Sequence, residues 1–139
     1  MAIKNNTVES NAIPPNFGKD NTTLICVIIG KKKYDKKMKK HVENEYHGKY
    51  EFVLRENLNS DEFKDTSNYR YIFDIEKIEK TSTFYVSGRF QTRNVIVNSL
   101  GIFDRQAGIM YKSNVTSSFS SKIIQAYMIN LEKERLKNQ

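Results

Sequence analysis

The strongest chemical signal in the sequence is a run of lysines in residues 31–40. The run holds seven lysines and one aspartate, a net charge of +6, while the formal net charge of the whole chain is +7. Clustered ammonium groups can bind nucleic-acid phosphates or an anionic membrane surface. The predicted anion-binding face consists of Lys31, Lys32, Lys33, Lys36, Lys37, Lys39 and Lys40. A simpler alternative stays open, in which these lysines form an ordinary solvated helix face.

The residues around the lysine run favour the simpler alternative. Nucleic-acid sites usually combine lysine with arginine, which forks onto phosphates, and with aromatic rings, which stack on bases. No arginine occurs between Lys4 and Arg55. The aromatic residues of the predicted helix that carries the run fall on its apolar stripe, which we expect to be buried.

The sequence offers no set of residues that would form a metal site or a disulfide. The single cysteine, Cys26, cannot form an intramolecular disulfide, and its apolar neighbours Ile25 and Val27 indicate a buried thiol. His41 and His47 are six residues apart, on opposite sides of a helix, so they cannot share a metal. We expect each histidine at the surface or near a helix cap, and we predict no metal and no cofactor.

The acidic and hydroxyl side chains do not form a recognisable catalytic set either. Asp74, Glu76 and Glu79 lie near the end of one predicted strand, and we expect them on an exposed strand face. The serines of residues 116–121 have no plausible general base and mark a helix start. We therefore predict no catalytic residues and a protein that is not an enzyme.

The pattern around the lysine run predicts a β-α-β unit. Residues 23–29 form an apolar run typical of a strand buried on both faces, and Gly30 ends it. Residues 34–46 repeat apolar side chains every four positions, which predicts a helix, and residues 49–55 alternate as a second strand. Two strands joined by a helix in this way are expected to be parallel.

The second half of the chain predicts an antiparallel meander and a final helix over 118–137. Strands are expected at 69–75, 83–86, 93–103 and 109–113, with a turn at 80–82, a bulge or break at 87–88 and a hairpin tip at 104–108. The predicted fold class is α+β, a mixed sheet of about five strands with two helices on one face. The predicted core is Leu24, Ile25, Val27, Ile29, Met38, Val42, Phe52, Phe73, Val95, Val97, Ile123, Tyr127 and Leu131.

Domain organisation and targeting follow from the first twenty residues. Residues 1–20 are polar and contain the pair Pro14-Pro15, so we expect a flexible tail, in which Ile13 and Phe17 are able to pack onto the body, followed by one domain over 21–139. This segment has no apolar signal core. The chain is therefore expected to be either cytosolic or a secreted protein from which a signal peptide was removed.

The order of predicted elements and the hairpin Ile102-Phe103-Asp104-Arg105-Gln106-Ala107-Gly108-Ile109 resemble small bacterial envelope lipoproteins. The architecture is similar to the N-terminal domain of the Tol-system propeller protein, the curli secretion lipoprotein and the outer-membrane activators of penicillin-binding proteins. Those proteins share a strand–aspartate–x–x–x–glycine–strand hairpin. In sequence, the chain most resembles secreted Bacteroidetes lipoproteins of unknown function. The segments that carry this resemblance are VIIGKKKYDKKMKK, where the first strand runs into the helix, and GKYEFV, at the second strand. The resemblance covers about residues 22–136.

The resemblance implies a non-enzymatic accessory or scaffold domain of the cell envelope, in the periplasm or at the outer membrane, that binds a protein partner. We expect partner binding or self-association through a sheet face or edge. A membrane would be reached only through a lipid tether that this sequence does not contain. The alternative is a cytosolic nucleic-acid-binding protein that uses the basic helix over Lys31–Lys40.

Overall fold

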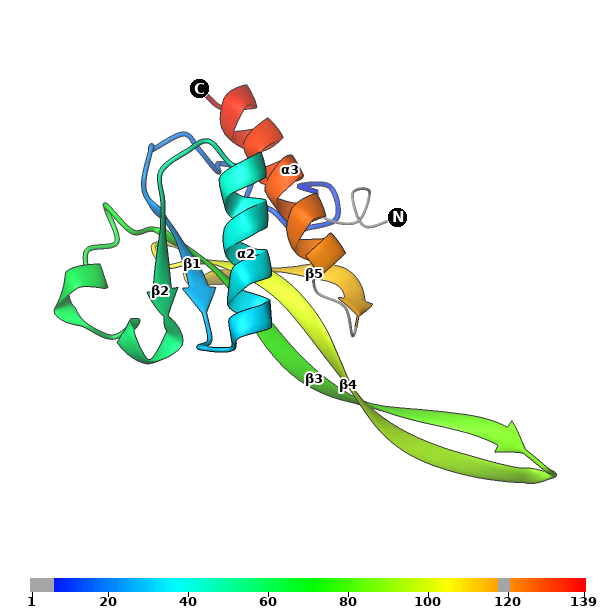
Figure 1. Cartoon of the computed structure of the whole chain (residues 1–139). Coiled ribbons are helices and arrows are strands. Elements are labelled where there is room, and N and C mark those ends of the chain that lie inside the picture. The colour runs from blue at the N-terminus through cyan, green and yellow to red at the C-terminus, as the bar shows by residue number, and fades with distance from the viewer. Residues whose placement is uncertain (1–6, 118–120) are drawn as a thin grey trace.

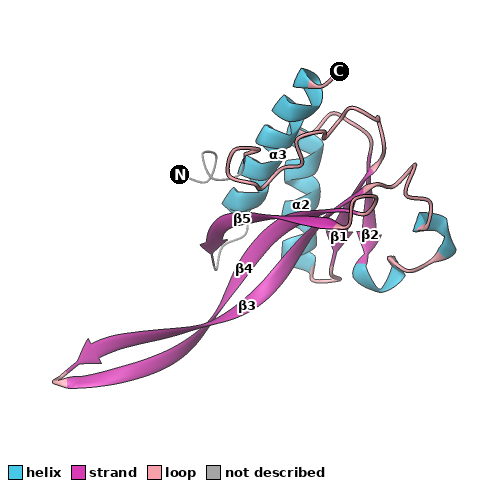
Figure 2. Cartoon of the chain, turned by 180° about the vertical axis from the view of Figure 1, so that it is seen from behind, coloured by secondary structure: helices cyan, strands magenta, loops and turns pink. Residues whose placement is uncertain are grey.

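The structure is a computed structural model that describes residues 7–117 and 121–139, with the side chains of these residues apart from 76–80, 82, 95–98 and 114–117 (Figure 1). Five strands form one mixed sheet in the order β2-β1-β3-β4-β5. Two helices, α2 and α3, lie side by side on one face of this sheet, as both views show (Figures 1 and 2). The α+β fold class and the placement of the helices are confirmed.

The predicted β-α-β unit is present. Strand β1 (Leu24–Ile28) leads into helix α2 (Lys32–Glu45), and β2 (Tyr50–Leu54) returns parallel to β1, with all five residues of each strand paired. Asp35 holds the connection between strand and helix. Its two carboxylate oxygens accept the backbone N–H groups of Ile29 and Gly30, each at 2.9 Å. Gly30 has a φ of 80°, which suits glycine at this tight turn.

The remaining strands form the meander, but with only two long strands where several short ones were expected. Strand β3 (Tyr71–Val86) and β4 (Arg89–Asp104) pair antiparallel along their whole length, and β5 (Ile109–Ser117) pairs with β4. The predicted turn at 80–82 is wrong, because the ladder continues through it and the Thr81 hydroxyl donates to Asn94 Oδ1 across the strands at 3.1 Å.

The predicted bulge at 87–88 is instead the turn of this long hairpin. Ser87 and Gly88 both have positive φ, 50° and 81°. Two central residues with positive φ make a type I′ turn, whose twist matches that of the flanking strands. The chain therefore reverses at Ser87-Gly88.

The outer part of this hairpin extends beyond the sheet as a two-stranded ribbon, here called the arm (Figures 1 and 2). The arm consists of residues 78–86 and 89–97, nine opposed pairs from Ile78↔Val97 to Val86↔Arg89. Strand β5 reaches only to the pair Asn98↔Ser117, and β1 pairs with β3 only at Ile72 and Phe73. At 3.3 Å per residue the arm is about 30 Å long.

The main hydrophobic core lies between the sheet and the two helices, α2 and α3 (Ser121–Lys137). A smaller cluster of Ile25, Val27, Val53 and Phe63 lies on the opposite face. It is covered by the segment that contains two 3₁₀ turns, η1 (Arg55–Asn57) and η2 (Asp61–Phe63). We refer to this second side of the sheet as the outer face.

Most of the predicted core residues are buried. The buried ones are Leu24, Ile25, Val27, Met38, Val42, Phe73, Ile123, Tyr127 and Leu131. Ile29 and Phe52 are only half-buried because they lie towards the sheet margin. The side chains of Val95 and Val97 lie outside the described residues.

The expectation of a flexible tail over residues 1–20 requires a correction for its second half. Ala12, Ile13 and Phe17 are buried in the main core. The Tyr127 hydroxyl donates to the carbonyl oxygen of Ala12 at 2.5 Å, which ties the segment to α3. The segment also passes very close to that helix, since a Cβ on Gly18 would lie 2.7 Å from the Arg135 Cα. The packed part of the chain therefore begins before residue 21.

Candidate functional site

Helix α2 presents all seven predicted lysines to solvent. Lys32, Lys36, Lys39 and Lys40 share one side of the helix and border a shallow hollow, together with Gly30, Asp35 and Glu43. Lys33 and Lys37 lie on the adjoining side, and Lys31 is the N-cap. None of the seven forms an ion pair with a carboxylate of the described residues. The structure thus gathers them into one basic surface, here called the lysine face.

The first helical turn of the lysine face has an unusual electrostatic arrangement. Lysines at positions 31–33 lie at the positive end of the helix dipole, where cations are unfavourable and anions are favourable. Asp35 is the acidic residue of this turn, but both its oxygens are occupied by the backbone of the preceding loop. Farther along, the ammonium of Lys39 lies 5.9 Å from the centre of the Phe52 ring, so its stem rests on the sheet margin.

The two histidines do not lie together. His41 is buried, and its Nε2 lies 2.8 Å from the Ser121 hydroxyl, which joins α2 to the start of α3. Our expectation of a surface or cap position for His41 is therefore wrong. Burial, and then the charge of Lys40, lower the pKa of this imidazole. His47 is exposed, and its backbone N–H donates to Glu132. His41 thus has a structural role between the helices.

The tip of the arm carries a second candidate site, which includes the predicted strand over 83–86 but lies on a hairpin that the sequence analysis did not predict. Tyr85 and Phe90 are directly opposed in the ladder, and their ring centres lie 5.1 Å apart in an edge-to-face arrangement. Both rings are strongly exposed, at 64% for Tyr85 and 78% for Phe90. On the other face of the ribbon, the Arg93 guanidinium lies 5.2 Å from the centre of the Phe84 ring. The tip therefore has one aromatic face without charge and one face that carries arginine.

The sequence did contain a signal for this tip. Ser87-Gly88 is flanked on both sides by residues that favour strands, and residues 81–94 contain no acidic side chain. An aromatic segment without acidic side chains, centred on a Ser-Gly pair, is typical of a hairpin. The interpretation of 80–82 as a turn obscured it, because it divided one strand into two.

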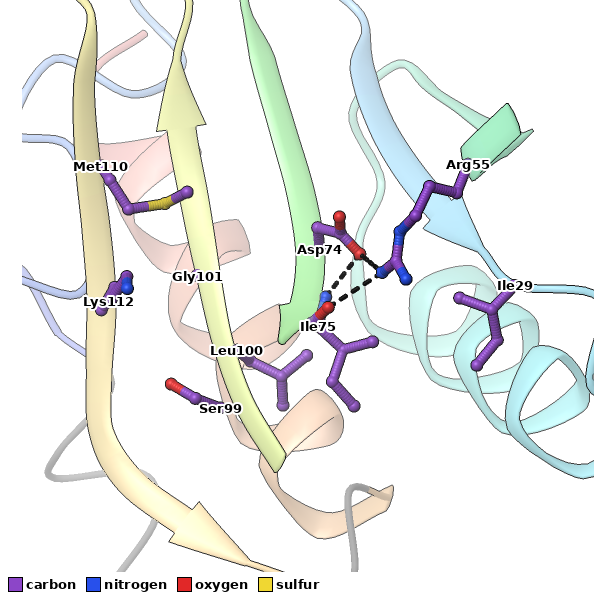
Figure 3. Close-up of a pocket in the computed structure, with 9 residues that line it drawn as sticks. All are labelled: Ile29, Arg55, Asp74, Ile75, Ser99, Leu100, Gly101, Met110 and Lys112. Atoms are coloured by element: carbon purple, nitrogen blue, oxygen red, sulfur yellow. Dashed lines mark hydrogen bonds and ion pairs between the residues drawn. The ribbon is translucent and has the colours of Figure 1, made fainter. Parts of the chain in front are cut away.

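The third candidate is a pocket of about 640 Å³ on the outer face (Figure 3). Its described lining residues are Ile29, Arg55, Asp74, Ile75, Ser99, Leu100, Gly101, Met110 and Lys112. On one side, the Arg55 guanidinium pairs with the Asp74 carboxylate and donates to the carbonyl oxygen of Ile75 at 2.9 Å. Asp74, which we expected on an exposed strand face, is thus half-buried in an ion pair. The side chains of Glu76 and Glu79 lie outside the described residues.

Within the described residues, no three histidine, cysteine, aspartate or glutamate side chains gather closely enough to hold a metal ion. Likewise, in the described part of the chain no helix has the length and apolar character needed to cross a membrane. Cys26 is buried, as expected, and burial raises the pKa of its thiol.

Comparison of the chain with protein-family models, with curated proteins and with solved structures found no match. The similarity to envelope lipoproteins therefore rests on the order of elements and on the hairpin at Asp104–Gly108, and it stays a prediction. The lysine face, the arm and the outer-face pocket are the candidate functional sites of the described residues.

Proposed function

We propose that this protein is a non-enzymatic accessory or scaffold domain of the bacterial cell envelope, and that it binds a protein partner through its arm. The observation that carries the proposal is the exposed pair of Tyr85 and Phe90 at the end of a ribbon that projects from the sheet. The predicted envelope location is supported by the resemblance in element order. The folded body, in this view, is the platform that holds the arm.

The exposed aromatic tip is typical of a binding surface. Tyrosine and arginine are enriched among the residues that contribute most to protein–protein affinity, and a large ring buries much area at low entropic cost. Tyr85, Val86 and Phe90 all have large, exposed side chains, and they flank the same hairpin turn. Clustered apolar side chains exposed to water favour association with a partner.

The backbone of the arm provides a second way to bind. A two-stranded ribbon leaves one row of N–H and C=O groups unpaired along each outer edge, and such edges accept an added strand. Among the described residues, no third strand pairs with residues 78–86 or 89–97. An isolated ribbon is marginally stable in water, so a partner along either edge would stabilise it.

The proposal is tested by site-specific photo-crosslinking in the source cells. A benzophenone side chain replaces Phe90 in one variant and Leu136 in a control variant. Leu136 is a matched control because it is also an exposed apolar residue, at 58%, but lies on α3. We expect one protein from the envelope fraction to be crosslinked at position 90 and not at 136.

The captured protein is then purified, and its affinity for the wild type and for Phe90→Ser is measured. We expect Phe90→Ser to weaken binding by more than about tenfold, as loss of a central aromatic contact does, without lowering the melting temperature. Equal crosslinking at both positions, or unchanged affinity of the serine variant, would contradict the role of the arm. Recovery of the native protein in the cytosolic fraction would contradict the envelope location.

The second candidate function is binding of nucleic acid through the lysine face. The observation that favours it is the exposure of seven lysines on α2 and its N-cap, which form no ion pair with a carboxylate of the described residues. Arginine and exposed aromatic rings are present as well, but on the arm. The two candidates thus use different elements and are separable by mutation.

A further inference from the structure

Strand β2 forms one margin of the sheet, and a groove follows its outer edge. Among the described residues β2 pairs only with β1, so a second row of its backbone N–H and C=O groups has no strand partner. The groove has a volume of about 440 Å³ and is lined by residues 51–54 of β2, by the end of β1 and by the segment around Glu62 and Phe63. We call it the β2 groove. An unpaired edge of this kind accepts an added strand.

The two sides of the β2 edge differ in chemistry. On the helix side, the half-buried ring of Phe52 packs against the main core, and the Lys39 ammonium lies 5.9 Å from its centre. On the outer face, Glu51 accepts a hydrogen bond from the Tyr69 hydroxyl at 3.0 Å. Glu62 is exposed there and forms no ion pair with a described residue. The described lining of the groove thus has two carboxylates and no basic side chain.

The two faces of the arm are divided in a matching way. Side chains alternate along β4, so Arg89 and Arg93 lie on one face and Phe90 lies on the other, with Tyr85. Both arginines are exposed, and neither forms an ion pair with a carboxylate in the described part of the chain. Residues 81–94 contain no acidic side chain. The β4 edge of the arm therefore has guanidinium groups on one face and an uncharged aromatic ring on the other.

The faces of the arm fit the β2 edge in one orientation. If residues 89–94 extend the sheet beyond β2, the two arginines lie on the outer face, near the two carboxylates of the groove. Phe90 then lies on the helix side, next to Phe52. The opposite placement would bring the arginines close to Lys39, where like charges repel. Charge and aromatic character therefore select the same orientation.

The arm and the β2 groove lie at opposite ends of the molecule, as both views show (Figures 1 and 2). A contact between them therefore joins two chains, because the arm points away from the groove of its own chain. Such a contact uses a different surface on each partner, so it is heterologous. Repeated from chain to chain, a heterologous contact closes a ring or continues as a filament.

We propose that the arm of one copy adds its β4 edge to the β2 edge of a second copy, within the β2 groove, so that the chain assembles head to tail. This inference rests on the proposed function of the arm and names its partner as another copy of the same chain. Backbone hydrogen bonds extend the sheet, and the arginines lie against Glu51 and Glu62. The exposed ring of Phe90 becomes covered at the same time.

The test measures the mass of the full chain in solution by analytical ultracentrifugation. At low salt and protein concentrations up to about 1 mM, where even a weak interface is populated, we expect the average mass to rise beyond that of a dimer. High salt should lower the average mass, because the guanidinium and carboxylate groups are exposed to screening.

Two variants and a control separate the arm from the groove. Phe90→Ser on the arm and Glu62→Lys in the groove should each weaken self-association by more than about tenfold. An equimolar mixture of these two variants should form a dimer that does not grow, since only one intact arm and one intact groove can meet. Glu9→Lys is the control, because Glu9 is also an exposed glutamate without an ion pair among the described residues, and it should assemble like the wild type. Thermal melts show whether each variant is folded.

Several outcomes would overturn the proposal. It fails if the wild type stays monomeric at about 1 mM, or if Glu9→Lys weakens assembly as much as Glu62→Lys does. It also fails if the mixture of the two variants stays monomeric or grows beyond a dimer.

The photo-crosslinking at position 90 distinguishes this inference from the proposed function. Capture of the chain itself supports both. Capture of a different protein by a chain that is monomeric in solution would overturn self-assembly and leave the binding role of the arm in place. If position 90 captures no protein at all and the chain is monomeric, both proposals fail.

Discussion

Arg70 and Asp104 form a two-pronged ion pair at the end of the sheet that lies away from the arm. The guanidinium Nε donates to Asp104 Oδ1 at 2.9 Å, and Nη2 donates to Oδ2 at 3.0 Å. The same carboxylate accepts the backbone N–H groups of Gln106 and Ala107, at 3.1 and 3.2 Å. One buried aspartate therefore holds both the β4–β5 turn and the residue that precedes β3.

Replacement of this aspartate is expected to be costly. Asp104→Asn removes one charge of a mostly buried pair and leaves Arg70 with only Asp20. We expect a loss of about 2–4 kcal/mol of unfolding free energy, measured by urea denaturation. Asp61→Asn is the control, because its ion pair with Lys64 is exposed and should contribute less than about 0.5 kcal/mol. Equal effects of the two changes would contradict this account.

The same site predicts acid sensitivity. Burial acts to raise the pKa of Asp104, but the hydrogen bonds from Arg70 and from the Ala107 and Gln106 amides outweigh it, so the net pKa is lowered. The unfolded chain then binds more protons than the folded one below about pH 4, the ordinary pKa of aspartate. Stability is therefore complete above this pH and falls as the pH decreases through the folded-state pKa. Asp104→Asn should flatten this fall, measured as unfolding free energy between neutral and acidic pH.

The thiol of Cys26 is expected to be inert in the folded protein. It is fully buried in β1, and burial raises its pKa, so the reactive thiolate is scarce at neutral pH. A disulfide reagent should not react with the folded chain and should label one thiol in urea. Rapid labelling in the absence of urea would show that β1 opens readily, which its interior position between β2 and β3 argues against.

Phe17 tests whether the N-terminal segment belongs to the core. Its ring lies between Tyr71 and Tyr46, with ring centres 5.1 and 6.1 Å away. Phe17→Ala should lower the unfolding free energy by about 3 kcal/mol through the cavity that it leaves. The same change at exposed Phe90 should cost less than about 0.5 kcal/mol. A negligible effect at position 17 would restore the expectation of a tail.

Charge reversal of the lysine face tests the nucleic-acid alternative. Replacement of Lys36, Lys37, Lys39 and Lys40 by glutamate should weaken oligonucleotide binding by more than about tenfold and reduce its salt dependence. The control reverses Lys122, Lys133 and Lys137, which are exposed on α3. If affinity is the same in the lysine-face variant and the wild type, α2 presents only a solvated surface.

The helices and strands that show a regular spacing of apolar residues were predictable from the sequence. The four-residue spacing of Met38, Val42 and Tyr46 and the apolar run at Leu24–Ile28 define α2 and β1, and each of these is found within two residues of its predicted bounds. The order of elements then limits the topology, because a strand–helix–strand unit is nearly always parallel and right-handed. Local pattern was thus sufficient for the fold class.

The features that the sequence did not reveal depend on contacts between distant residues. Ala12 is held in the core by the Tyr127 hydroxyl of α3, more than a hundred residues later, and the ring of Phe17 packs on Tyr46 and Tyr71. The pocket at Gly101 exists because three strands and the residue after β2 meet there. The arm was missed for a different reason: Thr81 and Ser82 suit both turns and strands, and only the partner strand decides between them.

The turn at Ser87-Gly88 has one more consequence. It closes a hairpin whose tip lies outside both hydrophobic clusters, so substitutions there are largely free of the constraints that hold the body together. Substitutions at the tip and substitutions in the core are therefore under different selective constraints. If the arm binds a partner as proposed, changes in about a dozen codons around this turn would be enough to alter the preferred partner, while the sequence of the folded body stays the same.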